Sequence, residues 1–362
     1  MKTIILTGGG TAGHVTPNLA LLPYLKDAGY EVRYIGSYNG IERKLIENAG
    51  IPYDGISSGK LRRYFDLKNF SDPFRVLKGC WEARKLIKKY KPDVVFSKGG
   101  FVAVPVVLAA KHYHVPTIIH ESDMTPGLAN KLCIPSAKKV CCNFPETLKY
   151  LPEEKAVLTG SPIRDELLTG DRLAGLQFTH LSAAKPVILV IGARLGSVKV
   201  NSAVRSVLPK LLEKFQVIHI CGKGNIDESL IGTSGYVQYE YVDSPLKHLF
   251  AAANIVVSRA GANSICEILA LRKPNVLIPL SAAASRGDQI LNANSFAKQG
   301  FSTVLEEESV TDESLMEAIT NTYENRHKFI EAMEKSQLNN AIDTIMNLIN
   351  EASASYFISL DP

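Results

Sequence analysis

Short apolar runs alternate along the chain with longer segments in which apolar residues recur every three or four positions. The runs have the length of buried strands, and the longer segments have the period of amphipathic helices. A first series of runs predicts strands at 2–7, 31–35, 94–97, 117–120, 139–142 and 156–158. A second series predicts strands at 187–191, 216–221, 237–241, 255–258, 275–279 and 302–305. This alternation is typical of α/β domains with parallel sheets and helical crossovers, and here it occurs twice.

The boundary between the two series is expected at 160–162, where glycine, serine and proline interrupt the pattern. We therefore predict an N-terminal domain at 1–162, a second domain at 163–335 and a C-terminal segment at 336–362. That segment should contain a helix that crosses back to the first domain, followed by a tail. Residues 169–185 are poorly periodic and are predicted to form a linker or a covering loop.

A glycine-rich loop with a histidine, residues 8–14, follows the first predicted strand. Its glycines permit a tight reversal and would leave backbone N–H groups to face a ligand, while Pro17 suits the first turn of the next helix. We interpret the loop as a phosphate cradle with His14 at its rim. The G-x-G-x-x-G spacing also fits a dinucleotide site. However, the strand at 31–35 ends in glycine and serine, without the carboxylate that would hold a ribose.

The composition, with 46% hydrophobic and 21% charged residues, is typical of a globular protein. The length of 362 residues exceeds the usual size of a single domain, so we predict two hydrophobic cores. No apolar run reaches the length of a membrane span, and the N-terminus enters a strand without the regions of a signal peptide. We therefore expect a cytoplasmic location. The net charge of +5 is modest and does not by itself indicate which kind of molecule the protein binds.

Neither a metal nor a disulfide framework is indicated by the sequence. The six cysteines include no C-x-x-C pair. Residues 120–124 lack the second histidine of the H-E-x-x-H zinc motif, and no Asp-x-Asp pair is present to chelate a diphosphate-bound metal. We predict no obligatory metal and no other cofactor.

Several further blocks accompany the glycine loop in a fixed order. With 8–14 and Pro17 they are 98–101 (KGGF), 120–123 (HESD), 160–164 (GSPIR), 258–267 (SRAGANSICE) and 280–294. In this order and over about residues 1–340, the chain resembles the MurG family of GT-B glycosyltransferases.

The resemblance implies a GT-B fold, in which two Rossmann-like domains with parallel sheets face a central cleft. It also implies an inverting transfer of N-acetylglucosamine from UDP-GlcNAc to the C4 hydroxyl of the MurNAc-pentapeptide of lipid I. The product would be lipid II, for peptidoglycan synthesis and hence cell shape and division. Two alternatives stay open: a GT-B transferase with another donor or lipid acceptor, and a catalytically silent scaffold of the cell-wall machinery.

Site residues are carried over from the family by position. His14 would be the catalytic base, with an unperturbed pKa near ~6.5 that leaves a neutral imidazole at cytoplasmic pH. The resemblance assigns acceptor binding to Gly99, Gly100 and Asp123. It assigns donor binding to Thr11, Ala12, Gly13, Arg164, Arg194, Val242, Ala262, Asn263, Glu267 and Gln289.

Other roles are open for three of these residues. His14 would otherwise only orient its loop, and Arg164 would form a salt bridge at the hinge. Glu267 lies three residues after Ser264 and would otherwise be its capping-box partner.

The second glycine loop departs from the family at Arg194, because the family usually has Gly-Gly-Ser where this chain has glycine, alanine and arginine. The arginine would either contact the donor diphosphate or crowd the donor.

The segment 60–91 holds eleven Lys or Arg residues against three acidic ones. A helix at 73–90 would bury one apolar stripe and leave a second, which we call the Trp81 stripe: Phe74, Leu77 and Trp81, flanked by Lys78, Arg84, Lys85 and Lys88. An apolar stripe edged with cations suits an anionic membrane surface, so we predict peripheral attachment to the inner leaflet. The alternative is packing of the stripe on a neighbouring loop. Nucleic acid is not an expected partner, whereas UDP-GlcNAc, lipid I and other cell-wall synthesis proteins are.

Overall fold

The computed structural model describes residues 1–59, 72–192, 196–284 and 287–358. The chain forms two compact units. Unit 1 comprises Met1–Arg164 together with Asn340–Pro362, and unit 2 comprises Asp165–Asn339. The predicted domain boundaries after residues 162 and 335 therefore fall a few residues before the ends of these units at Arg164 and Asn339.

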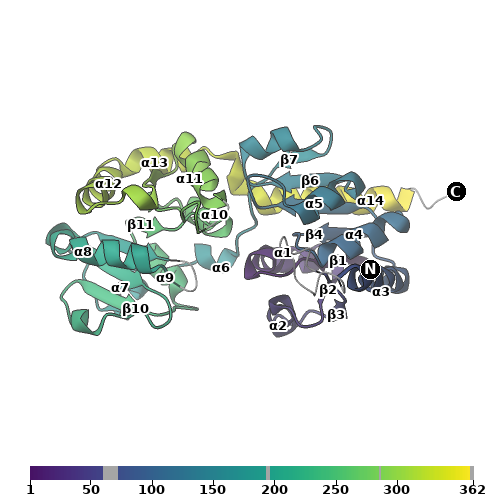
Figure 1. Cartoon of the computed structure of the whole chain (residues 1–362), viewed down its shortest axis with the longest axis horizontal. Coiled ribbons are helices and arrows are strands. Elements are labelled where there is room, and N and C mark those ends of the chain that lie inside the picture. Colours follow the sequence, from purple (N-terminus) through teal and green to yellow (C-terminus); the bar gives the residue numbers. More distant parts are fainter. Residues whose placement is uncertain (60–71, 193–195, 285–286, 359–362) are drawn as a thin grey trace. The chain divides into compact units, whose positions relative to one another are not determined.

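Unit 1 is built on a seven-stranded parallel sheet with the order β3-β2-β1-β4-β5-β6-β7. Its strands are β1 (Lys2–Thr7), β2 (Tyr30–Ser37), β3 (Tyr53–Ile56), β4 (Val94–Ser97), β5 (Thr117–Glu121), β6 (Lys139–Cys142) and β7 (Ala156–Leu158). Both neighbours of β1 follow it in the chain, so the direction of winding reverses between β1 and β4 (Figure 1). In open parallel sheets of this kind, ligands bind at the carboxyl ends of the strands where the order reverses.

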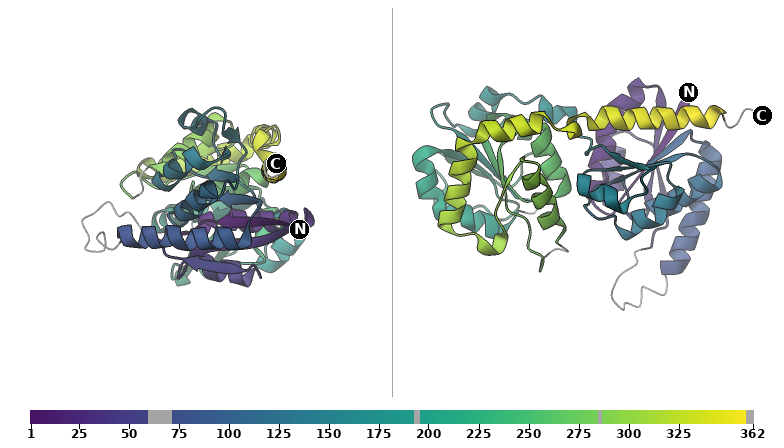
Figure 2. Two further views of the ribbon diagram at one scale, coloured as in Figure 1. Left: turned by 90° about the vertical axis from the view of Figure 1, so that its right-hand side faces the viewer. Right: turned by 90° about the horizontal axis from the view of Figure 1, so that it is seen from above.

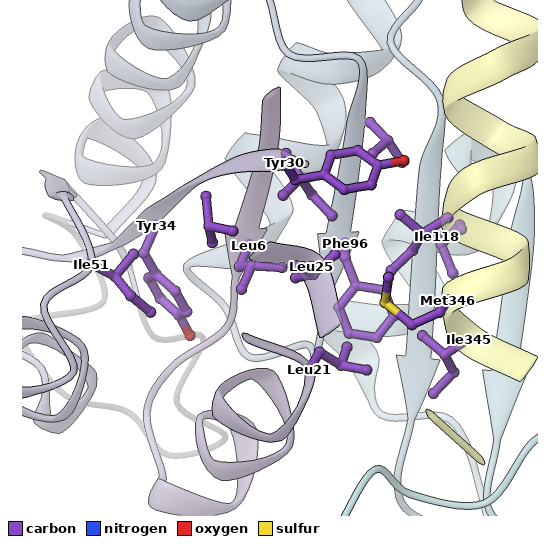
Figure 3. Packing of buried hydrophobic residues seen from close by; sticks show 14 of the residues in the cluster. Leu6, Leu21, Leu25, Tyr30, Tyr34, Ile51, Phe96, Ile118, Ile345 and Met346 are labelled. Carbon is purple, nitrogen blue, oxygen red and sulfur yellow. The ribbon is translucent and has the colours of Figure 1, made fainter. Parts of the chain in front are cut away.

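Helices cover both faces of the unit 1 sheet (Figures 1 and 2). They are α1 (Thr16–Asp27), α2 (Ile41–Asn48), α3 (Asp72–Tyr90), α4 (Ala103–His112), α5 (Leu128–Cys133) and α14 (Ala341–Ile358). The helix expected to cross back from the C-terminal segment is α14. Its Ile345 and Met346 pack into the core beside Phe96 and Ile118 (Figure 3). The hydroxyl of Tyr30 also bonds to the Asn350 side chain at 3.0 Å, so α14 belongs to unit 1.

Unit 2 repeats the architecture with a six-stranded parallel sheet of order β10-β9-β8-β11-β12-β13. Its strands are β8 (Val187–Ile191), β9 (Gln216–Ile220), β10 (Tyr236–Tyr239), β11 (Ile255–Ser258), β12 (Asn275–Leu277) and β13 (Thr303–Val304). Its helices are α6 (Asp165–Leu168), α7 (Arg172–Thr179), α8 (Val198–Lys214), α9 (Leu246–Ala252), α10 (Ala262–Ala270), α11 (Asp288–Lys298), α12 (Asp312–Glu324) and α13 (Arg326–Glu334). The winding reverses between β8 and β11, the counterparts of β1 and β4.

The prediction that 169–185 is a linker or covering loop is wrong, because α7 lies within it. Asp171 caps this helix by accepting a hydrogen bond from the Ala174 N–H at 2.7 Å. Gly175 packs so close to α9 that a Cβ there would collide with the carbonyl oxygen of His248. A helix that approaches its neighbour through glycine lacks a full apolar stripe, which explains the weak periodicity of its sequence.

Of the helices in the described ranges, none combines the length and the apolar character needed to span a membrane.

Candidate functional site

Two glycine turns lie side by side where the winding of unit 1 reverses. The first follows β1 and the second, Gly99 and Gly100, follows β4. The N–H of Gly9 donates to the carbonyl of Gly99 at 3.3 Å, and a Cβ on Gly100 would collide with the carbonyl oxygen of Gly9. Gly99 and Gly100 have φ of +91° and +87°, which other residues rarely adopt. The structure therefore brings the predicted acceptor glycines together with the His14 loop.

The first glycine turn is held by bonds within the protein. The Gly9 N–H is engaged by Gly99, and the Gly10 N–H donates to the Glu42 carboxylate at 3.3 Å. The carbonyl of Gly8 accepts from the Tyr34 hydroxyl at 2.7 Å. The expectation that this turn leaves its amides to face a ligand is therefore wrong for Gly9 and Gly10, because backbone groups that are already paired do not bind a phosphate.

His14 ends a short 3₁₀ helix, Ala12–His14, that leads into α1. Its Nδ1 lies 2.8 Å from the carbonyl oxygen of Gly9 and 3.3 Å from the hydroxyl oxygen of Thr11. Because a carbonyl oxygen only accepts, Nδ1 carries the proton of the neutral ring, and Nε2 keeps its lone pair. Nε2 is then the atom of His14 that is able to act as a base. Thr11, Ala12 and Gly13 lie in the same turn.

Burial lowers the pKa of His14 below its usual value of 6.5, and the nearby Lys98 charge acts in the same direction. The Gly9 bond and the charges of Asp123 and Glu42 oppose this shift without cancelling it.

A nuclear magnetic resonance titration should therefore find that His14 becomes protonated only below pH 6.5. Because the lowered pKa belongs to the folded state, the same titration in urea should return to about 6.5, the value of an unfolded chain. A midpoint at or above 6.5 in the folded protein would contradict this placement.

Lys98 directly follows β4 and is buried beneath the two turns. Its Nζ lies 2.7 Å from His120 Nδ1 and 2.6 Å from the Ser122 hydroxyl, and His120 Nε2–H donates to the Gly160 carbonyl at 2.7 Å. Burial and the Lys98 charge hold the pKa of His120 well below its usual range, so His120 is neutral. His120 is thus a buried support rather than a second base.

The adjoining Glu121 is also buried and shapes the loop that carries Asp123. It accepts from the N–H groups of Asp123 at 2.8 Å and Gly127 at 3.1 Å, and from the Asn130 amide at 2.7 Å. Burial raises the pKa of the Glu121 carboxyl. Of the predicted acceptor residues, Asp123 is partly exposed, and its charge acts on His14.

The corresponding site in unit 2 lies between the ends of β8 and β11, where two helices begin. Ser197 caps α8 by accepting from the Val200 N–H at 3.3 Å, and α10 begins after Gly261. Two helix N-termini at one sheet edge suit a diphosphate, because the positive ends of their dipoles favour anions. Arg194, and with it the departure from the family pattern, lies outside the described residues.

Arg259 joins the loops around this edge, although sequence reasoning did not select it as a site residue. It is buried, and its guanidinium donates to the Ile278 carbonyl at 3.0 Å and to the Ser197 hydroxyl at 2.6 Å. It also forms an ion pair with Glu307, which Lys199 contacts at 3.0 Å. In the sequence Arg259 directly follows an apolar run and belongs to the block 258–267 that carries the family resemblance, but neither feature assigns it a role.

The predicted donor residues of unit 2 gather at the same edge. The Gln289 side-chain oxygen accepts from the N–H groups of Ala260 at 3.3 Å and Leu280 at 2.9 Å, so Gln289 ties the β11 and β12 loops together. Ala262 and Asn263 form the first turn of α10. The cap of this helix is Gly261, so the capping-box interpretation of Glu267 is wrong.

The last two predicted donor residues belong to other segments of the chain. Val242 follows β10 and is buried, and Arg164 is the exposed last residue of unit 1 before the chain enters unit 2.

No group of three or more His, Cys, Asp or Glu side chains placed to hold a metal is found among the described residues. A reaction without a metal stays a prediction.

Comparison with known proteins gives matches to both units. Residues 4–142 match the glycosyltransferase family 28 N-terminal domain, and residues 187–348 match the glycosyltransferase family 28 C-terminal domain. A Lachnoclostridium phytofermentans protein is 66% identical over 97% of this chain and 99% of its own length. It is named UDP-N-acetylglucosamine–N-acetylmuramyl-(pentapeptide) pyrophosphoryl-undecaprenol N-acetylglucosamine transferase. A Clostridium novyi protein of that name is 58% identical over 96% of this chain and 98% of its own.

Solved structures share the architecture. The crystal structure of Acinetobacter baumannii MurG superposes with a TM-score of 0.76 at 26% identity, covering 97% of this chain and 100% of the other. A UDP-GlcNAc 2-epimerase from Neisseria meningitidis superposes with a TM-score of 0.68 at 15% identity, covering 97% and 100%, and this likeness shows the fold alone. Two doubly wound units of this kind form a GT-B fold, which confirms the predicted fold class.

Proposed function

Because the chain belongs to glycosyltransferase family 28, we infer that it transfers N-acetylglucosamine from UDP-N-acetylglucosamine to undecaprenyl-diphosphate-linked N-acetylmuramyl-pentapeptide. The observation that carries this inference is 66% identity, over almost the whole chain, to transferases named for that reaction. It places the protein in peptidoglycan synthesis.

The reaction is a single displacement at the anomeric carbon of the donor sugar. Nε2 of His14 takes the proton of the acceptor C4 hydroxyl, and the oxygen forms a bond to the anomeric carbon as the bond to UDP breaks. One displacement inverts the configuration, so the new linkage is β. The pairing of Nδ1 with Gly9 supports this role, because it leaves Nε2 as the free base.

Departure of UDP requires stabilisation of a developing diphosphate charge. We assign this to the N-termini of α8 and α10, and the cations Arg164 and Arg194 would contribute charge. Glu267 would bind the ribose hydroxyls, Val242 the uracil through its backbone, and Gln289 the sugar. On the acceptor side, Gly99, Gly100 and Asp123 would meet the lipid-linked substrate.

Donor choice tests the assignment to UDP-GlcNAc against a transferase with another donor. A ligand at about a hundred times its Kd adds about 2.7 kcal/mol to the stability of the folded state. UDP-GlcNAc should therefore raise the Tm more than UDP-glucose, UDP-GalNAc or GDP-mannose at equal concentration. Glu267→Gln should reduce that rise, whereas Glu317→Gln, on the exposed face of α12, should not. A larger rise with another nucleotide sugar would favour a different donor.

We also propose that unit 1 binds the membrane surface through the Trp81 stripe, which lies on α3. Phe74, Leu77 and Trp81 are 76%, 67% and 65% exposed, whereas Ala83 and Ile87 on the other face of α3 are buried. Lys78, Arg84, Lys85 and Lys88 around the stripe are exposed. These exposures favour a surface role for the stripe over packing on a loop.

Charge supports an anionic surface as the partner. Unit 1 contains 24 Lys or Arg against 17 Asp or Glu, a net charge of +7, while unit 2 contains 17 against 19. A lipid-linked acceptor also requires the enzyme to work at a bilayer. We place the protein at the cytoplasmic face of the membrane as a peripheral protein, where other cell-wall synthesis proteins are potential partners.

Alanine at Phe74, Leu77 and Trp81 together should strongly reduce co-sedimentation with phosphatidylglycerol vesicles. The binding free energy of such a surface comes from two sources. Apolar burial contributes about 25 cal/mol per Å², and each Lys or Arg near an anionic membrane contributes about 1 kcal/mol. Leu173→Ala is the matched control, because Leu173 is 65% exposed but lies on unit 2. Unchanged sedimentation of the triple variant would contradict the assignment.

A further inference from the structure

Glu42 is a fully buried carboxylate beneath the His14 loop that the reaction as described does not use. It lies in the first turn of α2, where the helix dipole favours a negative charge. Its carboxylate accepts from the N–H of Ser37 at 3.0 Å, from the Ser37 hydroxyl, and from the N–H of Gly10 at 3.3 Å. Three donors thus converge on one buried anion, which compensates the cost of its burial.

The position is shaped for this side chain by three glycines: Gly9 after β1, Gly36 in β2 and Gly40 at the cap of α2. A Cβ on Gly9 would lie 2.5 Å from Glu42 Oε1, and a Cβ on Gly40 would collide with Oε2. A Cβ on Gly36 would lie 3.0 Å from Glu42 Cγ. Replacing Gly9 or Gly40 would therefore force the carboxylate to move, whereas a Cβ on Gly36 would first collide with the Tyr53 hydroxyl.

One peptide group connects this carboxylate to the catalytic histidine. The N–H that Glu42 holds and the carbonyl that accepts from His14 Nδ1 belong to the same peptide bond, between Gly9 and Gly10. A trans peptide is planar and its N–H and C=O point in opposite directions, so fixing one group fixes the other. A negative charge on the N–H side also polarises the peptide and makes its oxygen a stronger acceptor.

We propose that Glu42 is the positioning residue of His14: through the Gly9–Gly10 peptide it holds the imidazole in the Nδ1–H tautomer, with Nε2 as the base. The proposal deepens the proposed function and rests on it for the role of His14 as base.

The substitution Glu42→Gln tests whether the charge and hydrogen bonds of Glu42 matter for His14, rather than only the space that its side chain fills. It has nearly the same shape, but its amide has a single oxygen. If that oxygen serves Ser37, the NH₂ group faces the Gly10 N–H, and two donors repel each other. Charged groups facing His14 from other elements, Lys98 and Asp123, are unchanged in this variant.

The tautomer of His14 is measured first, by ¹⁵N shifts of its ring nitrogens above the pH of its protonation, with the signal assigned by its loss in His14→Gln. Wild-type protein and the control Glu47→Gln, on the exposed end of α2, should show Nε2 unprotonated. Glu42→Gln should show a mixture of tautomers. Its kcat should fall in proportion to the lost Nδ1–H tautomer, about twofold for an equal mixture and about tenfold if one tenth remains, while KM for UDP-GlcNAc changes less than kcat.

Ser37→Ala provides the test if Glu42→Gln does not fold, because it removes one donor to Glu42 and leaves the glycine turn intact. It should shift the tautomer in the same direction by a smaller amount. An Nδ1–H tautomer that is unchanged in both folded variants would overturn the proposal. The ¹⁵N measurement of the His14 tautomer does not require catalytic turnover. An inactive wild-type enzyme would therefore refute the proposed function, and the effect of Glu42 on the tautomer would still be tested.

Discussion

Replacement of His14 by alanine is expected to lower kcat for transfer by about 10²- to 10⁴-fold, the range that a positioned general base contributes. The acceptor hydroxyl would then lose its proton only to water, while the donor loops of unit 2 stay unaltered. The Kd of UDP, measured by calorimetry, should therefore stay within about twofold of the wild-type value, since binding energy at a separate site is unaffected.

His327→Ala is the control for this experiment, because His327 is exposed on α13, outside the segments assigned to substrate binding. It should leave turnover unchanged. Full turnover by His14→Ala would remove the base assignment and leave His14 with the alternative role of orienting its loop.

Gly196→Ala is expected to abolish donor binding at concentrations that saturate the wild type. Gly196 has φ of +77°, and an added Cβ would collide with the carbonyl oxygen of Cys221 at the end of β9. The left-handed backbone costs about 1–2 kcal/mol for any other residue, and the collision must displace the loop that leads into α8. Calorimetry with UDP measures the loss of affinity, and urea unfolding measures the loss of stability.

Gly232→Ala is the control that separates the cost of the left-handed backbone from the effect of the Cβ collision. Gly232 has a similar φ of +83° in the same unit, but an added Cβ would meet no atom within 4 Å. It should cost about 1–2 kcal/mol of unfolding free energy and leave UDP affinity unchanged. Equal UDP affinity in both variants would show that the β8 loop does not bind the donor.

The doubly wound fold was predictable because strands buried on both faces form continuous apolar runs. The strand β3 was missed because it lies at the sheet edge, only partly buried, and its sequence Tyr-Asp-Gly-Ile is not an apolar run. The expected strand at 275–279 was too long, since Ile278 stays buried after β12 has ended. Apolar character reports burial, and burial continues past the last residue of the strand.

The site was predictable only where local sequence carries the chemistry. A glycine loop with a histidine is visible in one window, and the structure brings His14 beside Gly99 and Gly100. Glu42 was not predictable, because its significance depends on glycines and donors that only the folded chain brings together. Arg259 is similar, since its partners Ser197 and Glu307 come from distant parts of the sequence.

The most direct test of the central claim is transfer itself. Purified protein is incubated with labelled UDP-GlcNAc and undecaprenyl-diphosphate-linked MurNAc-pentapeptide in detergent micelles containing EDTA. We expect a lipid-linked disaccharide with a β linkage, formed with release of one UDP for each sugar transferred. Protein that binds UDP-GlcNAc but forms no labelled lipid under these conditions would contradict the account.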